Sequence, residues 1–567
     1  MDRFRFARRP SRLGLLLVAF VVAVPDGCRG ADEANAEAYP LSLALQTLER
    51  DLTDPDYRAV LGTMIHTDLR AEWQRVATPD NYVVFAQRHG GPEAIANDPD
   101  LKTAHERRKR IADGFLELMR EAHEKKKLKV PFDDPALLLE VLTSADRRLP
   151  EGVAPSVAIE PLLPVPGAEK HWPCFRGPSQ QGLVYSEVPI PASWAADENV
   201  LWRAGLPGRG NSSPVIWGHR LFVTAEGASG DDKEAAPDRL LLCFDRRDGS
   251  PLWQHAAPKA DTQEGLYWKN TFASATPVTD GERVIAFFGN AGLVCCDMDG
   301  ERLWHRDVGT FPTIHGPGTS PVLYRDLVYL IQDQTSGESL CAAYDVRTGE
   351  QRWKRERPNN SGWSTPVLLR VGDRDELIYN GSFDVTSYDP ATGKTLWMLE
   401  GTSEEAIPMV VSGGGLIYST SGRNGPSLAI RPGGNGDVTE THLVWRNKRG
   451  APHVPSPLYH DGRLYFTSDT GIAVCLDAAT GDTLWQERLR GRFSASPLLL
   501  GTTILFLNED GVAYMVESAR EFRLVGENDL DAITLATPAI LDGRIYFRTE
   551  THLICVGTSE SRTVNTP

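Results

Sequence analysis

The sequence lacks a surplus of positive charge and any apolar run long enough to cross a membrane. Lys and Arg number 60 against 76 Asp and Glu, which gives a formal net charge of −16. An acidic surface repels nucleic acid and anionic lipid headgroups. The longest apolar run, residues 13–24, is shorter than the roughly 20 residues that a membrane-spanning helix needs. We therefore expect no nucleic-acid partner and no transmembrane span.

Catalytic and metal-binding motifs are also scarce. The chain contains no serine-protease, P-loop or zinc motif, and no Cys-x-x-Cys-His for haem attachment. Four histidines near the N-terminus are His66, His89, His105 and His123. Only the last two share a predicted helix, and they are five helical turns apart, so we interpret all four as surface or structural residues. No metal site is predicted.

Residues 1–30 have the pattern of an export signal, with an arginine-rich start followed by the short apolar run. Two forms of processing fit the end of this segment. Cys28-Arg29-Gly30 is a small-x-small site for ordinary signal peptidase, and Cys28 is alternatively the lipid-modified first residue of a lipoprotein. Either form predicts export to the periplasm or the cell envelope.

Residues 31–148 show apolar side chains at helical spacing and predict a small helical domain. Asp98-Pro99 opens its longest helix, predicted through Lys127, and Asp134-Pro135 opens a last helix over 136–145. Residues 149–171 are rich in proline and form a predicted linker.

From residue 172 to about 560 the sequence is built from repeats. A Ser-Pro or Thr-Pro pair (once Ile-Pro) opens each unit, and the prolines recur at intervals of 40–63 residues: Pro214, Pro277, Pro321, Pro366, Pro408, Pro457, Pro497 and Pro538. Five units close on an Asp-turn-Gly element followed four residues later by Trp. Each unit has the turn signals of four short antiparallel strands. This period predicts a mainly β fold, an eight-bladed β-propeller.

The tryptophans indicate how the blades pack and how the ring closes. Their fixed distance from a turn favours packing between neighbouring blades over ligand binding. The predicted docking residues are Trp202, Trp253, Trp304, Trp353, Trp397, Trp445 and Trp485. Trp202 precedes the first unit, and the last unit, 537–557, has only three strands. We predict that strand 200–203 completes the last blade, which removes the exposed edges of an open array.

Eight cysteines in an exported chain suggest disulfides, but their positions argue against pairing. Cys243, Cys295, Cys475 and Cys555 occupy equivalent strand positions in different blades, which lie far apart. We interpret them as small buried apolar residues. Cys295-Cys296 lies within a strand, where adjacent side chains point to opposite faces, and a vicinal disulfide is not expected there.

The repeats, together with the segments WPCFRGP, ENVLW and GRGNSSPV, resemble the bacterial PQQ-like (pyrroloquinoline-quinone-like) β-propeller proteins over about 172–557. That group includes quinoprotein alcohol dehydrogenases and BamB-type scaffolds of outer-membrane assembly. The dehydrogenases imply PQQ held by Ca²⁺, a catalytic Asp and often adjacent cysteines. No calcium triad or base maps onto this sequence, so we expect no cofactor, and PQQ with Ca²⁺ belongs only to the alternative of a quinoprotein oxidoreductase.

The innermost strand of a propeller blade begins beside the central channel, so residues preceding each proline cluster on one rim. We predict a channel-rim ligand site, without catalytic residues, from these positions. Its candidate members are Arg209, Asn211, Asn270, His315, Trp363, His453 and Arg492. Alternatively, these side chains only fill and hydrate the channel.

Taken together, the sequence favours a non-catalytic binding or scaffolding protein of the bacterial cell envelope, resembling BamB-type proteins. Residues 227–238 and 433–441 are the loops expected to face an envelope protein partner, and a monomer is expected. The alternatives are a quinoprotein oxidoreductase and a carbohydrate- or peptide-binding module that uses the channel rim.

Overall fold

The computed structural model divides the chain into two compact units, Met1–Ala145 and Asp146–Pro567. It describes residues 49, 52–53, 82, 85–86, 89, 92–124 and 157–558, with short gaps at 186–187, 228–235, 314, 335, 359, 423–424 and 448–449. The predicted export signal, Cys28 and the predicted helix at 136–145 lie outside the described residues. No helix among those described is long and apolar enough to cross a membrane.

The first unit is helical where it is described. It contains α6 (Pro92–Asn97) and α7 (Pro99–Glu124), the second of which matches the helix predicted from Asp98-Pro99 over its described residues. The Asp98 carboxylate accepts the backbone N–H groups of Asp100 and Leu101, which caps the helix start. Ile111, Phe115 and Leu118 are buried, so one face of α7 forms part of a core.

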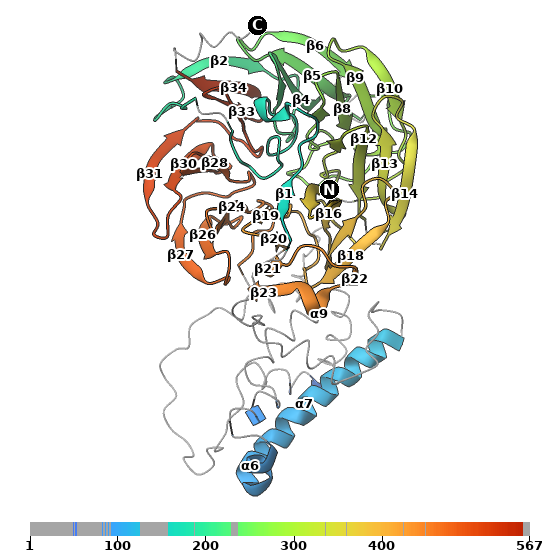
Figure 1. Ribbon diagram of the computed structural model, residues 1–567, viewed down its shortest axis with the longest axis vertical. Coiled ribbons are helices and arrows are strands. Elements are labelled where there is room, and N and C mark those ends of the chain that lie inside the picture. The colour runs from blue at the N-terminus through green and yellow to red at the C-terminus, as the bar shows by residue number, and fades with distance from the viewer. Residues whose placement is uncertain are drawn as a thin grey trace, which may run out of the picture. The chain divides into compact units, whose positions relative to one another are not determined.

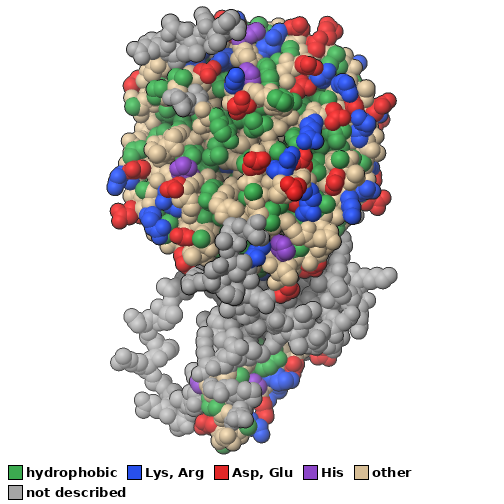
Figure 2. Space-filling view, in the orientation of Figure 1, with side chains coloured by type: hydrophobic (Ala, Val, Ile, Leu, Met, Phe, Trp, Pro, Cys, Tyr) green, Lys and Arg blue, Asp and Glu red, His purple; other side chains and the backbone are tan. Residues whose placement is uncertain are grey.

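The second unit consists of eight sheets, each built on four antiparallel strands and arranged radially around a central axis, which is an eight-bladed β-propeller (Figure 1). Charged side chains of both signs are interspersed around the edge of the visible face (Figure 2). Because each sheet packs between two others, its middle strands are buried along their whole length, as in β5 and β13. The outermost strands face solvent on one side, and β6 accordingly alternates between exposed and half-buried residues.

The first four blades run in chain order from the inner to the outer strand. Blade 1 contains β3 (Val215–Trp217), β4 (Arg220–Glu226), β5 (Arg239–Asp245) and β6 (Pro251–Ala256). Blade 2 contains β7 (Val278–Thr279), β8 (Arg283–Phe287), β9 (Leu293–Asp297) and β10 (Arg302–Arg306). Blade 3 contains β11 (Val322–Tyr324), β12 (Leu327–Gln332), β13 (Ser339–Asp345) and β14 (Gln351–Arg357). Blade 4 contains β15 (Val367–Val371), β16 (Arg374–Asn380), β17 (Asp384–Tyr388) and β18 (Thr395–Glu400), extended by β1 (Ile159–Pro161) and β22 (Gly436–Asp437).

The remaining blades repeat this order. Blade 5 contains β19 (Val411–Gly413), β20 (Leu416–Thr420), β21 (Ser427–Ile430) and β23 (Leu443–Asn447). Blade 6 contains β24 (Leu458–His460), β25 (Arg463–Thr467), β26 (Ile472–Asp477) and β27 (Thr483–Arg488). Blade 7 contains β28 (Leu498–Leu500), β29 (Thr503–Leu507), β30 (Val512–Glu517) and β31 (Leu524–Asp529). Blade 8 contains β32 (Ala539–Leu541), β33 (Arg544–Arg548), β34 (His552–Gly557) and, as its outer strand, β2 (Val200–Gly205).

The closure of the ring is confirmed. Strand β2, which precedes all the blades in sequence, pairs antiparallel with the last strand β34 and places Trp202 opposite Cys555. The two ends of the repeat array therefore share one sheet, and neither end leaves an open blade edge.

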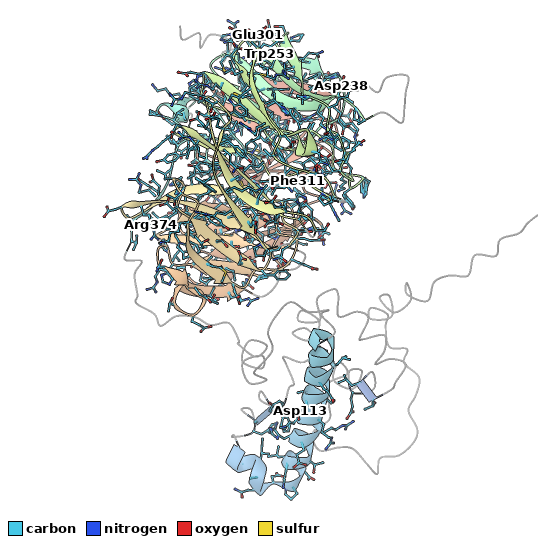
Figure 3. The ribbon with its side chains drawn as sticks, turned by 90° about the vertical axis from the view of Figure 1, so that its right-hand side faces the viewer. Asp113, Asp238, Trp253, Glu301, Phe311 and Arg374 are labelled. Atoms are coloured by element: carbon cyan, nitrogen blue, oxygen red, sulfur yellow. The ribbon has the colours of Figure 1, made fainter. Side chains whose placement is uncertain are left out.

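In six of the eight blades the outer strand carries a tryptophan that bonds to the next blade. A β-bulge in the outer strand pair skips the residue before Trp253, and the indole N–H of Trp253 donates to the Met298 carbonyl in the following blade's turn. The ring lies against Gly300, whose φ of 93° and lack of a side chain are both required there. Figure 3 shows Trp253 beside Glu301 of that same turn. Trp202, Trp304, Trp353, Trp445 and Trp485 donate to the following blade in the same way.

Four cysteines occupy the positions opposite the tryptophans, where a large side chain would clash with the indole ring. Cys243, Cys295, Cys475 and Cys555 each stand directly opposite a Trp on the neighbouring strand, and Ala or Ser fills the same position in blades 3, 4 and 5. All seven described cysteines are buried and free. In blade 7 the Trp is replaced by Gly526, and the opposite residue is the larger Met515. In this blade the larger residue lies on the middle strand and the smaller one on the outer strand, so the space between the blades is still filled.

Blade 4 departs from this pattern, because its tryptophan bonds within its own blade. The indole N–H of Trp397 donates to the buried Glu376 carboxylate at 2.7 Å. The following unit has no Asp-Gly turn to accept this bond, since residues 433–441 form β22 and the short α9 (Thr439–His442) instead. Strand β22 pairs parallel with β18, so this loop extends the outer edge of blade 4. The interior of the other predicted partner loop, 228–235, lies outside the described residues.

Candidate functional site

The innermost strands of the propeller surround a cavity of about 500 Å³ at the channel end where these strands begin. We call it the mouth cavity. Its volume falls within the range of roughly 300–1,000 Å³ that is usual for small-molecule sites. The residue before the proline of every unit lines this cavity: Ser213, Thr276, Ser320, Thr365, Ile407, Ser456, Ser496 and Thr537.

The Ser and Thr hydroxyls of these opening pairs accept backbone hydrogen bonds between most neighbouring blades, and we call this set of hydroxyls the hydroxyl ring. The backbone N–H of Ser213 donates to the Thr276 hydroxyl at 2.9 Å, and Thr276 N–H donates to the Ser320 hydroxyl at 3.0 Å. Thr365, Ser496 and Thr537 accept equivalent bonds, and Ser456 accepts the backbone N–H of Met409. The recurrent Ser/Thr-Pro pair therefore joins the starts of adjacent innermost strands.

The chain itself closes the other end of the channel. Residues 157–184, here called the channel plug, bond to the innermost strands downstream of the hydroxyl ring. Strand β1 pairs with β15, and Trp172 exchanges two backbone hydrogen bonds with Ile216. Gln180 bonds to the backbone of Pro366 and Leu368, and further contacts reach blades 2, 5, 6 and 7. Phe175 lines the mouth cavity, so the plug closes the channel below it.

A strip of four rings leads from the outer surface into the mouth cavity. Trp268 and Tyr267 have ring centroids 5.7 Å apart and are 69% and 48% exposed. Tyr267 stacks on His315 at 5.8 Å with an interplanar angle of 18°, and His315 lies 5.4 Å from Trp363. The Trp363 indole N–H donates to the Gly316 carbonyl, so the exposed part of this side chain is its apolar ring.

The loop that carries Tyr267 and Trp268, residues 257–274, is held across the mouth by ion pairs. Lys269 bonds both oxygens of the Glu509 carboxylate at 2.8 and 2.6 Å, which links the blade 1–2 connection to blade 7. Within the same loop, the Glu264 carboxylate forms a buried bidentate ion pair with Arg239 of β5. Both charges of each pair are compensated locally, so the loop is fixed without adding net charge to the cavity.

On the opposite wall, His453 lies between two carboxylates. Its Nε2 is 3.7 Å from a Glu405 oxygen, and its backbone N–H donates to Asp469 at 2.8 Å. Among the described residues no group of three or more His, Cys, Asp or Glu side chains could hold a metal ion.

The structure brings six of the seven predicted rim residues to this one cavity and leaves one outside it. Asn211, Asn270, His315, Trp363, His453 and Arg492 line the mouth cavity. Arg209 does not, because its guanidinium turns outwards to Glu550 at 3.5 Å and to the Trp268 carbonyl. The two asparagine amides hold the loop: Asn211 donates to the Lys269 carbonyl and Asn270 to the His315 carbonyl.

Sequence reasoning missed Tyr267, Trp268 and Lys269, as well as the acidic residues Glu405, Asp469 and Glu509. The signal for the first three was the interval of 63 residues between Pro214 and Pro277, which exceeds every other interval and shows that this unit carries extra chain. Asp469 and Glu509 precede a third strand and have the sequence pattern of ordinary turn residues.

The radial sheets, the tryptophans docked on turn glycines and the closing N-terminal strand define a β-propeller of PQQ-like repeats. More specifically, the chain belongs to the family described as outer membrane protein assembly factor BamB, whose model matches residues 178–380 and 436–550, more than half of the chain. The first matched stretch begins within the channel plug.

Among curated proteins, the chain is similar to tetrathionate hydrolase of Acidithiobacillus ferrooxidans. The two are 24% identical over 379 residues, which cover 59% of this chain and 70% of the hydrolase. A tetrathionate hydrolase of Acidianus ambivalens is 28% identical over 130 residues, 19% of this chain and 23% of that protein.

Among solved structures, the quinohemoprotein alcohol dehydrogenase of Comamonas testosteroni is similar in fold. It aligns with a TM-score of 0.50 and 11% identity, covering 69% of this chain and 82% of the dehydrogenase. At this identity the likeness concerns the fold alone.

Proposed function

We propose that this chain is a non-catalytic binding or scaffolding protein of the bacterial cell envelope, and that its ligand or partner enters the mouth cavity. The observation that carries the proposal is the convergence of side chains from several blades on one cavity that is blind at its inner end. Family membership favours an envelope role. The export signal predicted in residues 1–30 agrees with it.

The composition of the cavity supports binding over nucleophilic chemistry. Its hydroxyls accept hydrogen bonds from backbone N–H groups, as Thr276 does, rather than lying against a histidine base. The buried cysteines are no better candidates, since burial raises the pKa of the Cys243 and Cys555 thiols to about 12. These thiols are therefore protonated and inert at neutral pH.

The alternative of a quinoprotein requires a site for polyanionic PQQ and its Ca²⁺. The mouth cavity offers two strong cations, Lys269 and Arg492, and the first is already bound by Glu509. Three carboxylates share the same lining, which disfavours a polyanion. Cys295 and Cys296 are buried in β9 and do not line the cavity. The residues present do not fit PQQ.

The same balance of charge argues against tetrathionate, which is a dianion. A hydrolase for it would need a cationic cavity. Arg492 is exposed on the rim, and no ion pair is found for it within the described residues. A single exposed cation is a weak basis for binding two sulfonate groups, so we do not assign this substrate to the chain.

Capture of envelope material tests the proposal. The immobilised protein is incubated with detergent-solubilised envelope, and bound protein and polysaccharide are measured for three forms. His315→Ala/His453→Ala removes two cavity side chains and should abolish capture. The matched control, His219→Ala/His460→Ala, alters the turn after β3 and the last residue of β24, at the other end of blades 1 and 6, and should leave capture unchanged.

Equal capture by the wild-type protein and both variants would show that the mouth cavity takes no part in binding.

A second assay decides between binding and redox chemistry. The protein is incubated with PQQ, Ca²⁺ and a redox dye in the presence of alcohols and sugars. We expect no dye reduction, and reduction that requires both PQQ and Ca²⁺ would overturn the non-catalytic assignment.

A further inference from the structure

The mouth cavity combines three features that bear on the chemistry of its ligand: a wall of hydroxyl groups, a strip of aromatic rings and charges that are compensated locally. The argument below rests on the proposed binding function and identifies the ligand class for that same cavity.

The hydroxyl ring leaves hydrogen-bond donors available to a ligand. A hydroxyl group has one donor and two acceptor positions. The hydroxyls of Thr276, Ser320, Thr365, Ser456, Ser496 and Thr537 each accept a backbone N–H, and their protons donate to no other described atom. These six side chains are at least 95% buried and line the cavity. A ligand rich in hydroxyl groups would satisfy them.

The same bonds make the cavity a poor site for an extended peptide. Main-chain recognition of a peptide needs free backbone N–H and C=O groups along a strand. Here the N–H groups of Ser213, Ser456 and Ser496 at the innermost strand starts are already bonded to the hydroxyl of the next blade. A peptide backbone would compete with the bonds that join the blades.

The aromatic strip supplies flat apolar faces in a continuous line. Trp363 lies at the cavity, His315 and Tyr267 follow, and Trp268 extends the line onto the outer surface. Contiguous exposed apolar surface on a monomeric protein commonly marks a binding site. A pyranose ring with equatorial hydroxyls has an apolar C–H face that packs on such rings and a polar edge that bonds to hydroxyl groups.

Local charge compensation favours a neutral ligand. Lys269 is paired with Glu509, and His453 lies beside Glu405 and Asp469. An ionic ligand would have to displace one of these interactions or bind through the exposed Arg492 alone, whereas an uncharged sugar needs neither.

We infer that the mouth cavity binds the end of an oligosaccharide built from pyranose units with equatorial substituents. The terminal unit occupies the blind cavity against Trp363, and the next units stack on Tyr267 and Trp268. End-on binding follows from the channel plug, because no chain can pass through a channel that residues 157–184 close.

Titration calorimetry with two defined sugars tests this inference. The probes are cellohexaose and N-acetylchitohexaose, whose units present flat apolar faces, and the comparison sugar is maltohexaose, whose α-linkages curl the chain. We expect at least one of the two probes to bind the full-length protein, and maltohexaose to bind about tenfold more weakly or not at all.

Variants locate the binding. Tyr267→Ala and Trp363→Ala should each weaken binding about tenfold or more, with Tm unchanged for Tyr267→Ala. Phe383→Ala is the matched control, because Phe383 is a 46% exposed aromatic residue that does not line the cavity. Binding that survives Tyr267→Ala and Trp363→Ala, or binding of maltohexaose as tight as that of the probes, would overturn the inference.

The outcome also separates the inference from the proposed function. If neither probe binds at millimolar concentration while envelope capture still depends on His315 and His453, the sugar assignment fails and the binding function stands. If capture is also independent of these two residues, both fail.

Discussion

The two ends of the propeller channel are built from the same eight strands and differ in what fills them. At one end the chain's own residues 157–184 bond to the innermost strands, and Trp172 is 1% exposed. At the other end the side chains of several blades surround an open cavity, and Trp268 is 69% exposed. Two tryptophans of one chain therefore serve opposite ends of the channel. Because the channel plug closes one end of the channel, the other end forms a cavity that can hold a ligand.

The largest expected difference between the ends is in stability. Trp172→Ala should lower the free energy of unfolding by about 3–5 kcal/mol, because it empties a buried position in the channel plug. Trp268→Ala should change it by less than about 0.5 kcal/mol, because the side chain is exposed. Urea denaturation of both variants measures the contrast. Similar losses for the two tryptophans would show that the ends do not differ in this way.

A smaller loss is expected from Gln180, which bonds the plug to blade 4. Gln180→Ala leaves the buried Pro366 carbonyl without this donor and should cost about 1–3 kcal/mol. Gln263→Ala, in the exposed part of the mouth loop, is the matched control and should be neutral. Thermal unfolding compares them, and an equal Tm for both would contradict a structural role for Gln180.

The ion pair across the mouth should contribute less again. A double-mutant cycle with Lys269→Met and Glu509→Gln should give a coupling energy of about 1 kcal/mol, since both side chains are partly exposed. The same variants should raise amide exchange in residues 257–274 and leave residues 157–184 protected. Exchange that rises equally in the plug would show that the two ends unfold together.

The smallest effect is the pH dependence of the plug. Burial, with Arg246 nearby, lowers the pKa of His171, whose Nδ1 accepts the Gly218 N–H. The unfolded chain then binds a proton more readily than the folded chain as pH falls through the ordinary histidine pKa of about 6.5. Stability should fall over that window. His171→Asn should show a shallower dependence of Tm on pH, whereas the exposed control His219→Asn should keep the wild-type slope.

Local periodicity was enough to predict the propeller, its eight blades and the closing strand with Trp202, because those features repeat in sequence. The fixed spacing of proline, turn glycine and tryptophan reflects a contact made again in each blade. The exchange of volume between Gly526 and Met515 could not be foreseen, since it depends on cross-strand register.

The candidate site was predicted less completely. His315, Trp363 and His453 could be placed at the rim because they precede a strand that begins beside the channel. Arg209 also precedes such a strand, but its side chain contacts Glu550 and does not line the cavity. Tyr267 belongs to an insertion outside the repeat. The position of this loop over the mouth depends on tertiary contacts, which a local sequence pattern does not predict.

Residues 157–171 of the channel plug were predicted only as part of a linker, and residues 172–184 as the start of the propeller. The structure shows that both parts bond to the innermost strands of the channel. Backbone pairing of β1 with β15 joins residues about 210 positions apart in the chain, and such pairing has no signature in either segment alone.

The most direct test is hydrogen–deuterium exchange of the full-length protein with and without N-acetylchitohexaose. The account predicts slower exchange in residues 257–274, 311–320 and 361–365 at the mouth, and no change in residues 157–184. Slower exchange confined to the plug or to the turns at its end of the channel would contradict the assignment of the mouth as the binding end.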